Sequence, residues 1–352
     1  IVPPSGTAEK SYRGISVTLR GITFCGRGLG TKAGSHGISA ILPAWCLVRE
    51  LKIQDCSFTQ MAGDQIHLEA LNGADSAFVG VFLDNVRAWQ SWGHGLYVKN
   101  ATCMTVSNSQ FAANAKSGAY VESSGIRFFN ATFESNGHVV VTSEGSDAQL
   151  YGINCNTFMV LGCHFENFDG AWRDHQFFSC KGVVVELSGG VLIEGCLFVN
   201  GTFTPHSELY GTEGPGTSAD PIRRYEANVA ILINGSRYGF PAKIGMNYFD
   251  NCYYGIRSQP VTVNNAILGL YSVDVCNQSF AWAHNCLVPF DQCGGMGLPQ
   301  INPSYVPVNF QGYGDLPEYP SSEGLMYWDT TNHRFMVYNG VAWKIVTLTD
   351  LP

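Results

Sequence analysis

One irregular internal repeat constrains the fold of this chain more than any other feature. Each unit is a short segment of alternating apolar residues that ends in a small or Cys residue, a polar residue and an aromatic. The segments are LKIQDCSF (51–58), LDNVRAW (83–89), MTVSNSQF (104–111), RFFNATF (127–133), FMVLGCHF (158–165), VLIEGCLF (191–198) and AKIGMNYF (242–249). They recur about every 22 to 35 residues, with one longer gap, and turns rich in Gly and Asn lie between them. Such short period-two segments predict a β-solenoid, in which stacked coils bury the apolar face that one coil cannot bury alone.

The repeat resembles that of right-handed parallel β-helices, the fold of pectin-degrading enzymes and phage tailspikes. It extends over roughly residues 15 to 285. The resemblance implies an all-β fold with a parallel β-helix over residues 1–293 and an insertion at 199–228. The acidic residues of that insertion are expected to overhang a groove or to reach a neighbouring subunit.

The repeat also offers an explanation for the 12 cysteines. Cys56, Cys163 and Cys196 each lie two residues before the aromatic that ends a segment, so they are expected to stack inward on successive coils. Buried free thiols pack like small hydrophobic groups and favour folding in a reducing cytoplasm, whereas disulfides would indicate secretion. Five Asn-x-Ser/Thr triplets are interpreted as coil corners rather than glycosylation sites, because Asn tolerates left-handed turns. They begin at Asn100, Asn130, Asn200, Asn234 and Asn277.

The C-terminal part of the chain has another character. Residues 294–322 are rich in Gly, Pro and Tyr and are expected to form an extended linker. Residues 323–352 begin with EGLMYWDTTNHRFMVYNGVAWKIV, which predicts three short strands, LMYWD, RFMVYN and VAWKIV. This stretch resembles a small module found near the ends of phage tail fibres and tailspikes, which implies a homotrimer. The alternative is a hairpin that packs on its own β-helix.

Charge and hydropathy exclude some classes of partner. The net charge is −8 and no block of Lys or Arg occurs, whereas proteins that bind nucleic acid need a basic face. No apolar run approaches the ~18 residues of a membrane span. The chain begins with Ile1 and without a signal-peptide pattern, so an N-terminal portion is expected to be missing.

A first candidate site follows from the second strand of each coil. Its inward residues are predicted to be Ile66, Leu96, Ala119, Val139 and Phe177. Alternation then places two columns outward: His67, Tyr97, Tyr120, Val140 and Phe178 in one, and Glu69, Lys99, Glu122 and Thr142 in the other. Glu69 and Glu122 would lie two coils and about 9.6 Å apart, near the upper limit for inverting glycosidases. The tyrosines would offer stacking surfaces to sugar rings, and the alternative is a solvated, self-neutralising Glu–Lys–Glu ladder.

Two further groups add candidates. Asp64 and His94, on neighbouring coils, resemble part of the polygalacturonase signature through the Gly-His-Gly triplet at 93–95. The Asn-Thr-Asp, Asp-Asp and Arg-Ile-Lys elements of that signature are missing. The other group lies between Phe165 and Phe177, where the usual spacing of eight residues becomes twelve and predicts an enlarged turn. The alternative for that turn is an ordinary surface loop with an Arg–Asp ion pair.

These observations predict a homotrimeric phage tailspike that cleaves a bacterial surface polysaccharide by glycosidic hydrolysis with two carboxylates. The predicted catalytic residues are Glu166, Asp169, Asp174, Glu69, Glu122 and Asp64, and the predicted substrate-binding residues are Trp172, Arg173, His175, His67, His94, Tyr97, Tyr120 and Lys99. No cofactor or metal is expected, because the acidic residues are scattered without a repeated ligand spacing. Further expected partners are virion tail components, bound through the missing N-terminal portion.

Three alternatives remain open. A lyase would act by β-elimination on a uronate, with a base and a cation drawn from Lys99, Tyr97, His67 and Arg257. A tail fibre or adhesin would only bind glycan. A secreted pectinase-like enzyme would be a monomer with disulfides at Cys25, Cys46 or Cys286. The expected location is the virion tail, after assembly in the bacterial cytoplasm.

Overall fold

A computed structural model of the chain describes most of the region up to residue 200 and shorter stretches beyond it. The described residues are 12–26, 35–71, 76–137, 148–166, 172–173, 176–177, 181–200, 229–236, 242–250, 252, 254–259, 261–263, 266–268, 273–275, 282–284, 288–291, 326–329, 334–338 and 343–345. All regular structure in these ranges is β-strand, which confirms the all-β prediction. The same ranges contain no helix with the length and apolar character that crossing a membrane requires.

Three parallel sheets, here called A, B and C, contain most of the strands. Sheet A comprises β1 (Tyr12–Arg20), β4 (Cys46–Gln54), β7 (Ala77–Phe78), β8 (Val81–Asp84), β11 (Met104–Ser107), β14 (Gly125–Phe129), β17 (Thr157–Leu161), β22 (Val191–Glu194), β25 (Ala242–Gly245) and β30 (Val273–Val275). Sheet B comprises β2 (Thr23–Cys25), β5 (Ser57–Thr59), β9 (Arg87–Trp89), β12 (Gln110–Ala112), β15 (Thr132–Glu134), β18 (His164–Glu166), β23 (Leu197–Val199), β26 (Tyr248–Asp250) and β31 (Trp282–His284). Sheet C comprises β3 (Ile38–Leu42), β6 (Ile66–Ala70), β10 (Leu96–Lys99), β13 (Ala119–Glu122), β16 (Ala148–Ile153), β21 (Lys181–Ser188), β24 (Val229–Ser236), β27 (Tyr254–Gln259) and β32 (Val288–Asp291).

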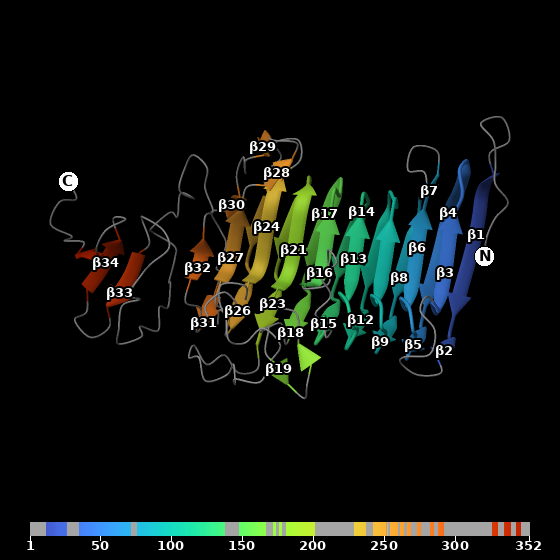
Figure 1. Ribbon diagram of the computed structural model, residues 1–352, viewed down its shortest axis with the longest axis horizontal. Helices are drawn as coiled ribbons and strands as arrows, with labels where there is room; N and C mark the ends of the chain where they lie inside the picture. The colour runs from blue at the N-terminus through green and yellow to red at the C-terminus, as the bar shows by residue number, and fades with distance from the viewer. Residues whose placement is uncertain are drawn as a thin grey trace.

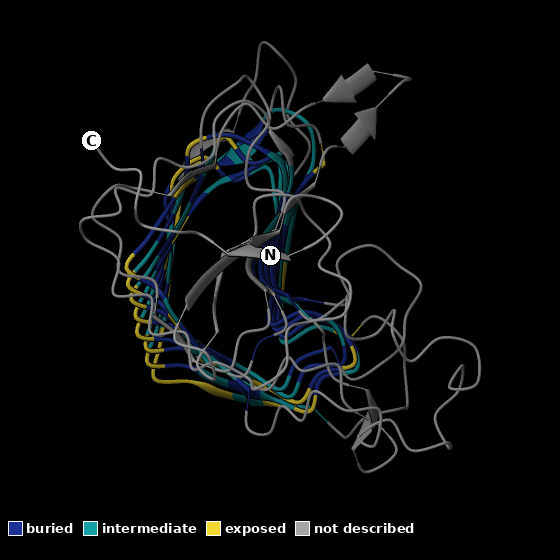
Figure 2. Cartoon of the chain, turned by 90° about the vertical axis from the view of Figure 1, so that its left-hand side faces the viewer, coloured by how far each residue is buried: buried dark blue, intermediate teal, exposed yellow. Residues whose placement is uncertain are grey.

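The chain passes through sheets A, B and C in turn, so each circuit forms one coil of a parallel β-helix. Each strand pairs in parallel with the equivalent strand of the next coil, as in β6 with β10 and β10 with β13. The strands stack along the long axis of the molecule (Figure 1). Seen along that axis, the described coils superpose, and their exposed residues gather at the corners (Figure 2). The predicted β-helix is therefore confirmed.

A column of phenylalanines from sheet B fills much of the core. Its rings stack between neighbouring coils with centroids 5.2 Å apart for Phe111–Phe133, 5.0 Å for Phe133–Phe165 and 4.7 Å for Phe165–Phe198. These side chains are fully buried, which confirms that the aromatic ending most repeat segments is a core residue. The segment LDNVRAW (83–89) is shifted by one position relative to the other repeat segments. Ala88 lies in the phenylalanine column between Phe58 and Phe111, and Trp89 points outward.

Residues in the left-handed conformation turn the chain at the coil corners. Between sheets A and B they include Asp55, Asn85, Asn108 and Asn130, with φ of 54°, 52°, 50° and 50°. Asn85 Nδ2 donates to Asp55 Oδ1 at 2.9 Å, and Asn130 Nδ2 donates to Asn108 Oδ1 at 2.9 Å, so the corners also form a hydrogen-bonded ladder. The interpretation of Asn100 and Asn130 as corner residues is confirmed, because Asn100 has φ of 59°. Asn200 is fully buried and Asn234 lies within β24.

The cysteine prediction is correct in burial and partly wrong in arrangement. Cys56, Cys163 and Cys196 are buried free thiols. Cys163 and Cys196 lie on adjacent coils, where their mutual hydrogen bond and burial raise the pKa of Cys196. Cys56 is several coils away, because Val86, Ser109 and Ala131 occupy the intervening positions of its column. Cys25, which the secreted alternative would place in a disulfide, is also a free thiol.

The predicted column of sheet C is correct for three coils and wrong beyond them. Ile66, Leu96 and Ala119 are aligned as predicted, but the next positions belong to Leu150 and Val183 rather than to Val139 and Phe177. Val139 lies outside the described residues. Phe177 lies in β20 (Gln176–Phe177), which pairs antiparallel with β19 (Trp172–Arg173), so it is not a rung of the coil. Long segments before β16 and β21 displaced the prediction, because Leu150 and Val183 follow Phe133 and Phe165 by 17 and 18 residues, more than the prediction allowed.

Besides the β19–β20 pair, two further small antiparallel sheets complete the described structure. One pairs β28 (Val261–Val263) with β29 (Ala266–Leu268). The other contains β33 (Met326–Asp329), β34 (Arg334–Tyr338) and β35 (Trp343–Ile345) in the order predicted for the C-terminal segment. The predicted linker at 294–322 lies outside the described residues.

The phenylalanine column yields a stability prediction. We expect Phe133→Ala to lower the free energy of unfolding by about 3–5 kcal/mol, because a buried ring between two stacked neighbours leaves a cavity. Trp89 points outward from β9 and is 38% exposed. Trp89→Ala is therefore expected to lower the free energy of unfolding by at most about 1 kcal/mol. Urea unfolding of both variants checks this, and similar losses would contradict the inward–outward assignment.

Candidate functional site

The outer face of sheet C brings together many of the predicted site residues. The register aligns His67, Tyr97 and Tyr120 in one column and Glu69, Lys99 and Glu122 in the next, as predicted. The continuation of both columns differs from the prediction. Tyr151 follows Tyr120 in place of Val140, and Ile153 follows Glu122 in place of Thr142.

The tyrosine column is not a platform for sugar rings. The Tyr97 ring stacks on His67 on one side, with centroids 4.5 Å apart, and on Tyr120 on the other, with centroids 5.5 Å apart. Tyr120 in turn stacks on Tyr151 at 5.5 Å and is only 8% exposed. A sugar ring needs a free aromatic face, and these faces are covered by their neighbours. These ring contacts argue against the predicted stacking role of Tyr97 and Tyr120.

The charged column lies at the surface of the same sheet. Lys99 Nζ lies 3.0 Å from Glu122 Oε1, and both side chains are about one-quarter to one-third exposed, at 30% and 26%. Glu69 Oε2 lies 3.4 Å from His67 Nε2 and is 23% exposed. Because Lys99 stands between them in the register, Glu69 and Glu122 are two coils apart, or about 9.6 Å at one strand spacing per coil.

Asp64 lies in the turn before β6 and links several imidazole groups. Its Oδ1 accepts a hydrogen bond from the backbone N–H of His94 at 2.7 Å, which confirms the predicted neighbourhood of these two residues. Its Oδ2 lies 2.7 Å from His67 Nδ1 and 3.5 Å from His36 Nδ1. The residue is 8% exposed. With both oxygens occupied, Asp64 is arranged to orient its neighbours.

The pKa values in this cluster follow from burial and hydrogen bonding. Burial acts to raise the pKa of Asp64, but the hydrogen bond from His67 and the contact with His94 outweigh it and lower the pKa. Burial acts to lower the pKa of His67, but its hydrogen bonds to Asp64 and Glu69 raise it above 6.5. Burial lowers the pKa of His36. Burial and the nearby Glu122 and Glu69 carboxylates raise the pKa of Tyr97, which makes its hydroxyl a poor base near neutrality.

The Gly-His-Gly triplet has a structural explanation. A Cβ on Gly93 would collide with Asp64 Oδ1 and with the backbone of Gly63, so glycine allows the Asp64 carboxylate to reach the His94 amide. The His94 side chain is 5% exposed, and its Nδ1 has no hydrogen-bond partner. Burial lowers the pKa of His94 to about 4. His94 is therefore a neutral packing residue whose backbone, rather than its ring, contacts Asp64.

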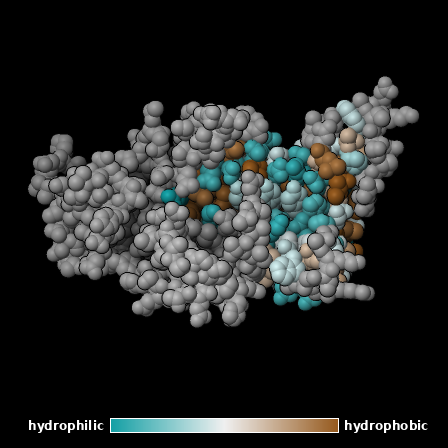
Figure 3. All heavy atoms as spheres, in the orientation of Figure 1, coloured by the Kyte–Doolittle hydropathy of each residue, from teal (hydrophilic) through white to brown (hydrophobic). Residues whose placement is uncertain are grey.

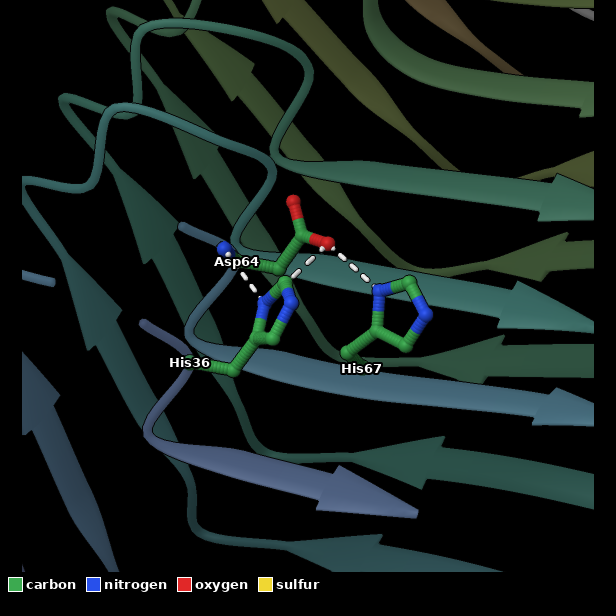
Figure 4. Close-up of side chains that lie close together, drawn as sticks. All are labelled: His36, Asp64 and His67. Carbon is green, nitrogen blue, oxygen red and sulfur yellow. Dashed lines mark hydrogen bonds and ion pairs between the residues drawn. The ribbon is translucent and has the colours of Figure 1, made fainter. Parts of the chain in front are cut away.

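His36 is a neighbour that the sequence reasoning missed. It precedes β3, one coil before Asp64, and its Nδ1 accepts a hydrogen bond from the Asp64 backbone N–H at 3.0 Å. Figure 4 shows His67 Nδ1 directed toward the Asp64 carboxylate, and His36 Nδ1 facing the Asp64 backbone nitrogen with the carboxylate close by. Among the described residues, His36, Asp64 and His67 form a group that could hold a metal ion. The sequence feature that could have identified His36 is the alignment of SHGIS (35–39) with GDQIH (63–67), which places His36 level with Asp64.

An exposed tryptophan near this cluster was also missed. Trp92 is 44% exposed and lies two residues before His94 in the turn between sheets B and C. The backbone register places Ala62 and Ala115 beside it on the adjacent coils. In the view of Figure 3, hydrophilic residues occupy much of the described surface and hydrophobic ones form small groups. Trp92 is thus an aromatic side chain that could contact a sugar.

The remaining predicted residues lie elsewhere. Glu166 is at the end of β18 in sheet B, 3.8 Å from His164, and four coils from Asp64. That offset is about 19 Å along the axis, so Glu166 does not join the sheet C cluster. Asp169, Asp174 and His175 lie outside the described residues. Trp172 and Arg173 are described only as the backbone of β19.

Comparison with known proteins identifies the fold. Residues 32–158 match the family model described as "Right handed beta helix region". Searches of the curated proteins and of the solved structures gave no match. The matched range includes His36, Asp64 and the sheet C columns up to Glu122. The chain thus contains a right-handed parallel β-helix, a fold common to carbohydrate-active enzymes and adhesins and compatible with polysaccharide hydrolases and lyases.

The buried neutral His94 predicts a pH dependence of stability. Its pKa is about 4 in the folded state against 6.5 for an ordinary histidine, so the unfolded state binds more protons between these pH values. The free energy of unfolding should therefore rise with pH from 4 to 6.5, by up to about 1.4 kcal/mol per pH unit from this residue. His94→Gln should remove this part of the dependence of the free energy of unfolding on pH. His164→Gln, at a more exposed histidine, is the control and should retain it. Urea unfolding at several pH values measures both, and parallel slopes for wild type and His94→Gln would contradict the assignment.

Proposed function

We propose that the protein is an endo-acting polysaccharide hydrolase whose active site is the outer face of β6, β10 and β13. The observation that carries this proposal is the outward column in which Glu69 and Glu122 flank Lys99. Their spacing of about 9.6 Å is close to the range of about 6.5–9.5 Å typical of inverting glycosidases. The Asp64–Glu69 pair serves less well, because the His67 ring lies between the two carboxylates.

In this proposal Glu69 is the general acid and Glu122 the general base. Glu69 gives its proton to the glycosidic oxygen as the C–O bond breaks, while Glu122 takes a proton from the water that attacks the anomeric carbon. His67 positions Glu69 through Nε2, and Asp64 positions His67 through Nδ1. Lys99 lies between the carboxylates and is placed to bind a polar or acidic group of the sugar.

Trp92 is the proposed sugar platform in place of the tyrosines. Its exposed ring is close in sequence to His94 and Gly93, which contact Asp64. A flat apolar surface at the turn that precedes β10 could bind a pyranose ring of the same polymer chain that crosses the carboxylate pair. The surface runs along the coil axis, which suits an extended polymer.

The proposed biological setting is a phage tailspike that acts on a bacterial capsule or O-antigen. Support comes from the C-terminal segment, which resembles phage tail modules in sequence and forms three antiparallel strands. Buried free thiols suit assembly in a reducing bacterial cytoplasm before incorporation into the virion tail.

β-Elimination is a second candidate function, favoured by the placement of His67 and Lys99 on one outer face, where Lys99 is two residues along the adjacent strand from the partner of His67. The raised pKa of Tyr97 argues against that residue as the base. Elimination would produce an unsaturated uronate, whereas hydrolysis produces reducing ends alone.

Activity measurements on a panel of capsular and O-antigen polysaccharides test the proposal. We expect new reducing ends without unsaturated-uronate absorbance, and NMR should show inversion at the anomeric carbon. The variants Glu69→Gln and Glu122→Gln should each lose at least about 100-fold in hydrolysis rate. Glu134→Gln, an outward position on sheet B, is the control and should keep wild-type activity. Unsaturated products would favour the lyase, and glycan binding without any product would favour an adhesin. Full activity in both variants would reject this site.

A homotrimer is expected if the C-terminal segment acts as in the modules it resembles. A meander of three short strands can bury little apolar area by itself, so it gains stability from a partner surface. Light scattering of the full chain should give three times the 38.3 kDa of one chain. A monomer would contradict the proposed trimer without affecting the carboxylate assignment.

A further inference from the structure

The geometry points to a transition-metal site formed by His36, Asp64 and His67, with Zn²⁺ as the ion that its donors suit. The three donor atoms are two imidazole nitrogens and one carboxylate oxygen, and all lie within 4.8 Å of one another. This donor set is typical of zinc sites that keep a position open, whereas Ca²⁺ and Mg²⁺ prefer oxygen donors alone. The inference is independent of the proposed hydrolysis.

The distances are close to those of a coordination sphere. With Zn–N and Zn–O bonds of about 2.0–2.2 Å, tetrahedral ligand atoms are roughly 3.3 Å apart. Asp64 Oδ2 lies 2.7 Å from His67 Nδ1 and 3.5 Å from His36 Nδ1, which brackets that value. Both distances from Asp64 Oδ2 are thus within about 0.6 Å of the tetrahedral value, and the three side chains already lie close together (Figure 4).

The surroundings provide the support that metal ligands require. Asp64 Oδ1 is fixed by the His94 amide at 2.7 Å, and His67 Nε2 faces Glu69 Oε2 at 3.4 Å. A carboxylate on the far nitrogen of a histidine is a common device that orients the ring and fixes its tautomer. All three ligands come from adjacent coils, joined by pairing of β3 with β6.

Glycines keep the space beside the donor atoms open. A Cβ on Gly63 would lie 2.9 Å from His36 Nδ1, and one on Gly93 would collide with Asp64 Oδ1. The side chains of His36, Asp64 and His67 are 20%, 11% and 14% exposed, so the cluster is reachable from solvent. The open coordination position would be filled by water or by an oxygen of a bound ligand.

Metal binding would exchange contacts without a change of oxidation state. Metal-bound His67 would be neutral, with its single proton on Nε2 facing Glu69, and any further proton would pass to solvent. The hydrogen bond from the Asp64 amide to His36 Nδ1 would be replaced by the bond to the metal. The nitrogen that accepts this hydrogen bond already has its lone pair available, which is the tautomer that a metal ligand needs.

Zn²⁺ titration of chelator-treated full-length protein tests the inference without any substrate. We expect the wild-type protein to bind one equivalent of Zn²⁺. In competition with a chromophoric chelator, the affinity of the variants His36→Gln, Asp64→Asn and His67→Gln for Zn²⁺ should be at least about 100-fold weaker. His164→Gln, a surface histidine 3.8 Å from Glu166, is the matched control and should keep that equivalent. Circular dichroism and unfolding in chelator would show that each variant is folded.

The Co²⁺ form of the wild-type protein provides a second test that needs no variant. Its spectrum should indicate nitrogen and oxygen ligands without thiolate-to-metal absorption, which separates this site from exposed thiols such as Cys25 and Cys103. Thiolate absorption at one equivalent, no binding by wild-type protein, or equal binding by the three ligand variants would overturn the inference. None of these results depends on whether any polysaccharide is cleaved.

Discussion

The pairing of each strand with its equivalent on the next coil is the interaction on which the rest of the structure depends. It satisfies the backbone hydrogen-bonding groups and repeats at about 4.8 Å along the axis. Because the pairing is parallel and in register, equivalent residues of successive coils form columns. The inward columns make a continuous hydrophobic core, and the outward columns place chemically active groups at fixed intervals. A coil by itself could do neither.

The same register explains why the candidate site is both ordered and crowded. Neighbouring rings along a column are close enough to stack, so Tyr97 is enclosed by His67 and Tyr120 and is not free for a ligand. Charged residues spaced by two coils remain separate, which gives Glu69 and Glu122 their proposed roles. Polar groups at the turn converge instead, because the turn before β6 directs Asp64 back toward the neighbouring coils.

The success of the sequence prediction depended on turn length. Phe58 to Ile66 and Phe111 to Ala119 span eight residues each, and in these coils the predicted outward columns are correct. Longer segments precede β16 and β21, so the assumed spacing assigned Val139 and Phe177 wrongly. The prediction also took Trp89 as the inward aromatic residue of its segment, whereas the small residue Ala88 occupies that position and Trp89 points outward. A hydrophobic pattern specifies the period of a solenoid, but residues inserted at corners leave that pattern unchanged.

The sequence by itself determined the coil repeat, the burial of the phenylalanines and thiols, and the alternation that sends His67 and Glu69 outward. These features follow from local patterns, because a strand has a period of two and a solenoid repeats its corners. Only the tertiary structure decided that His36, Asp64 and His67 meet, and that the tyrosines cover one another's faces. The physical reason is that His36 and Asp64 are 28 residues apart in the chain. Their contact depends on the conformation of the turns and on side-chain rotamers, which a pattern of residue types does not encode.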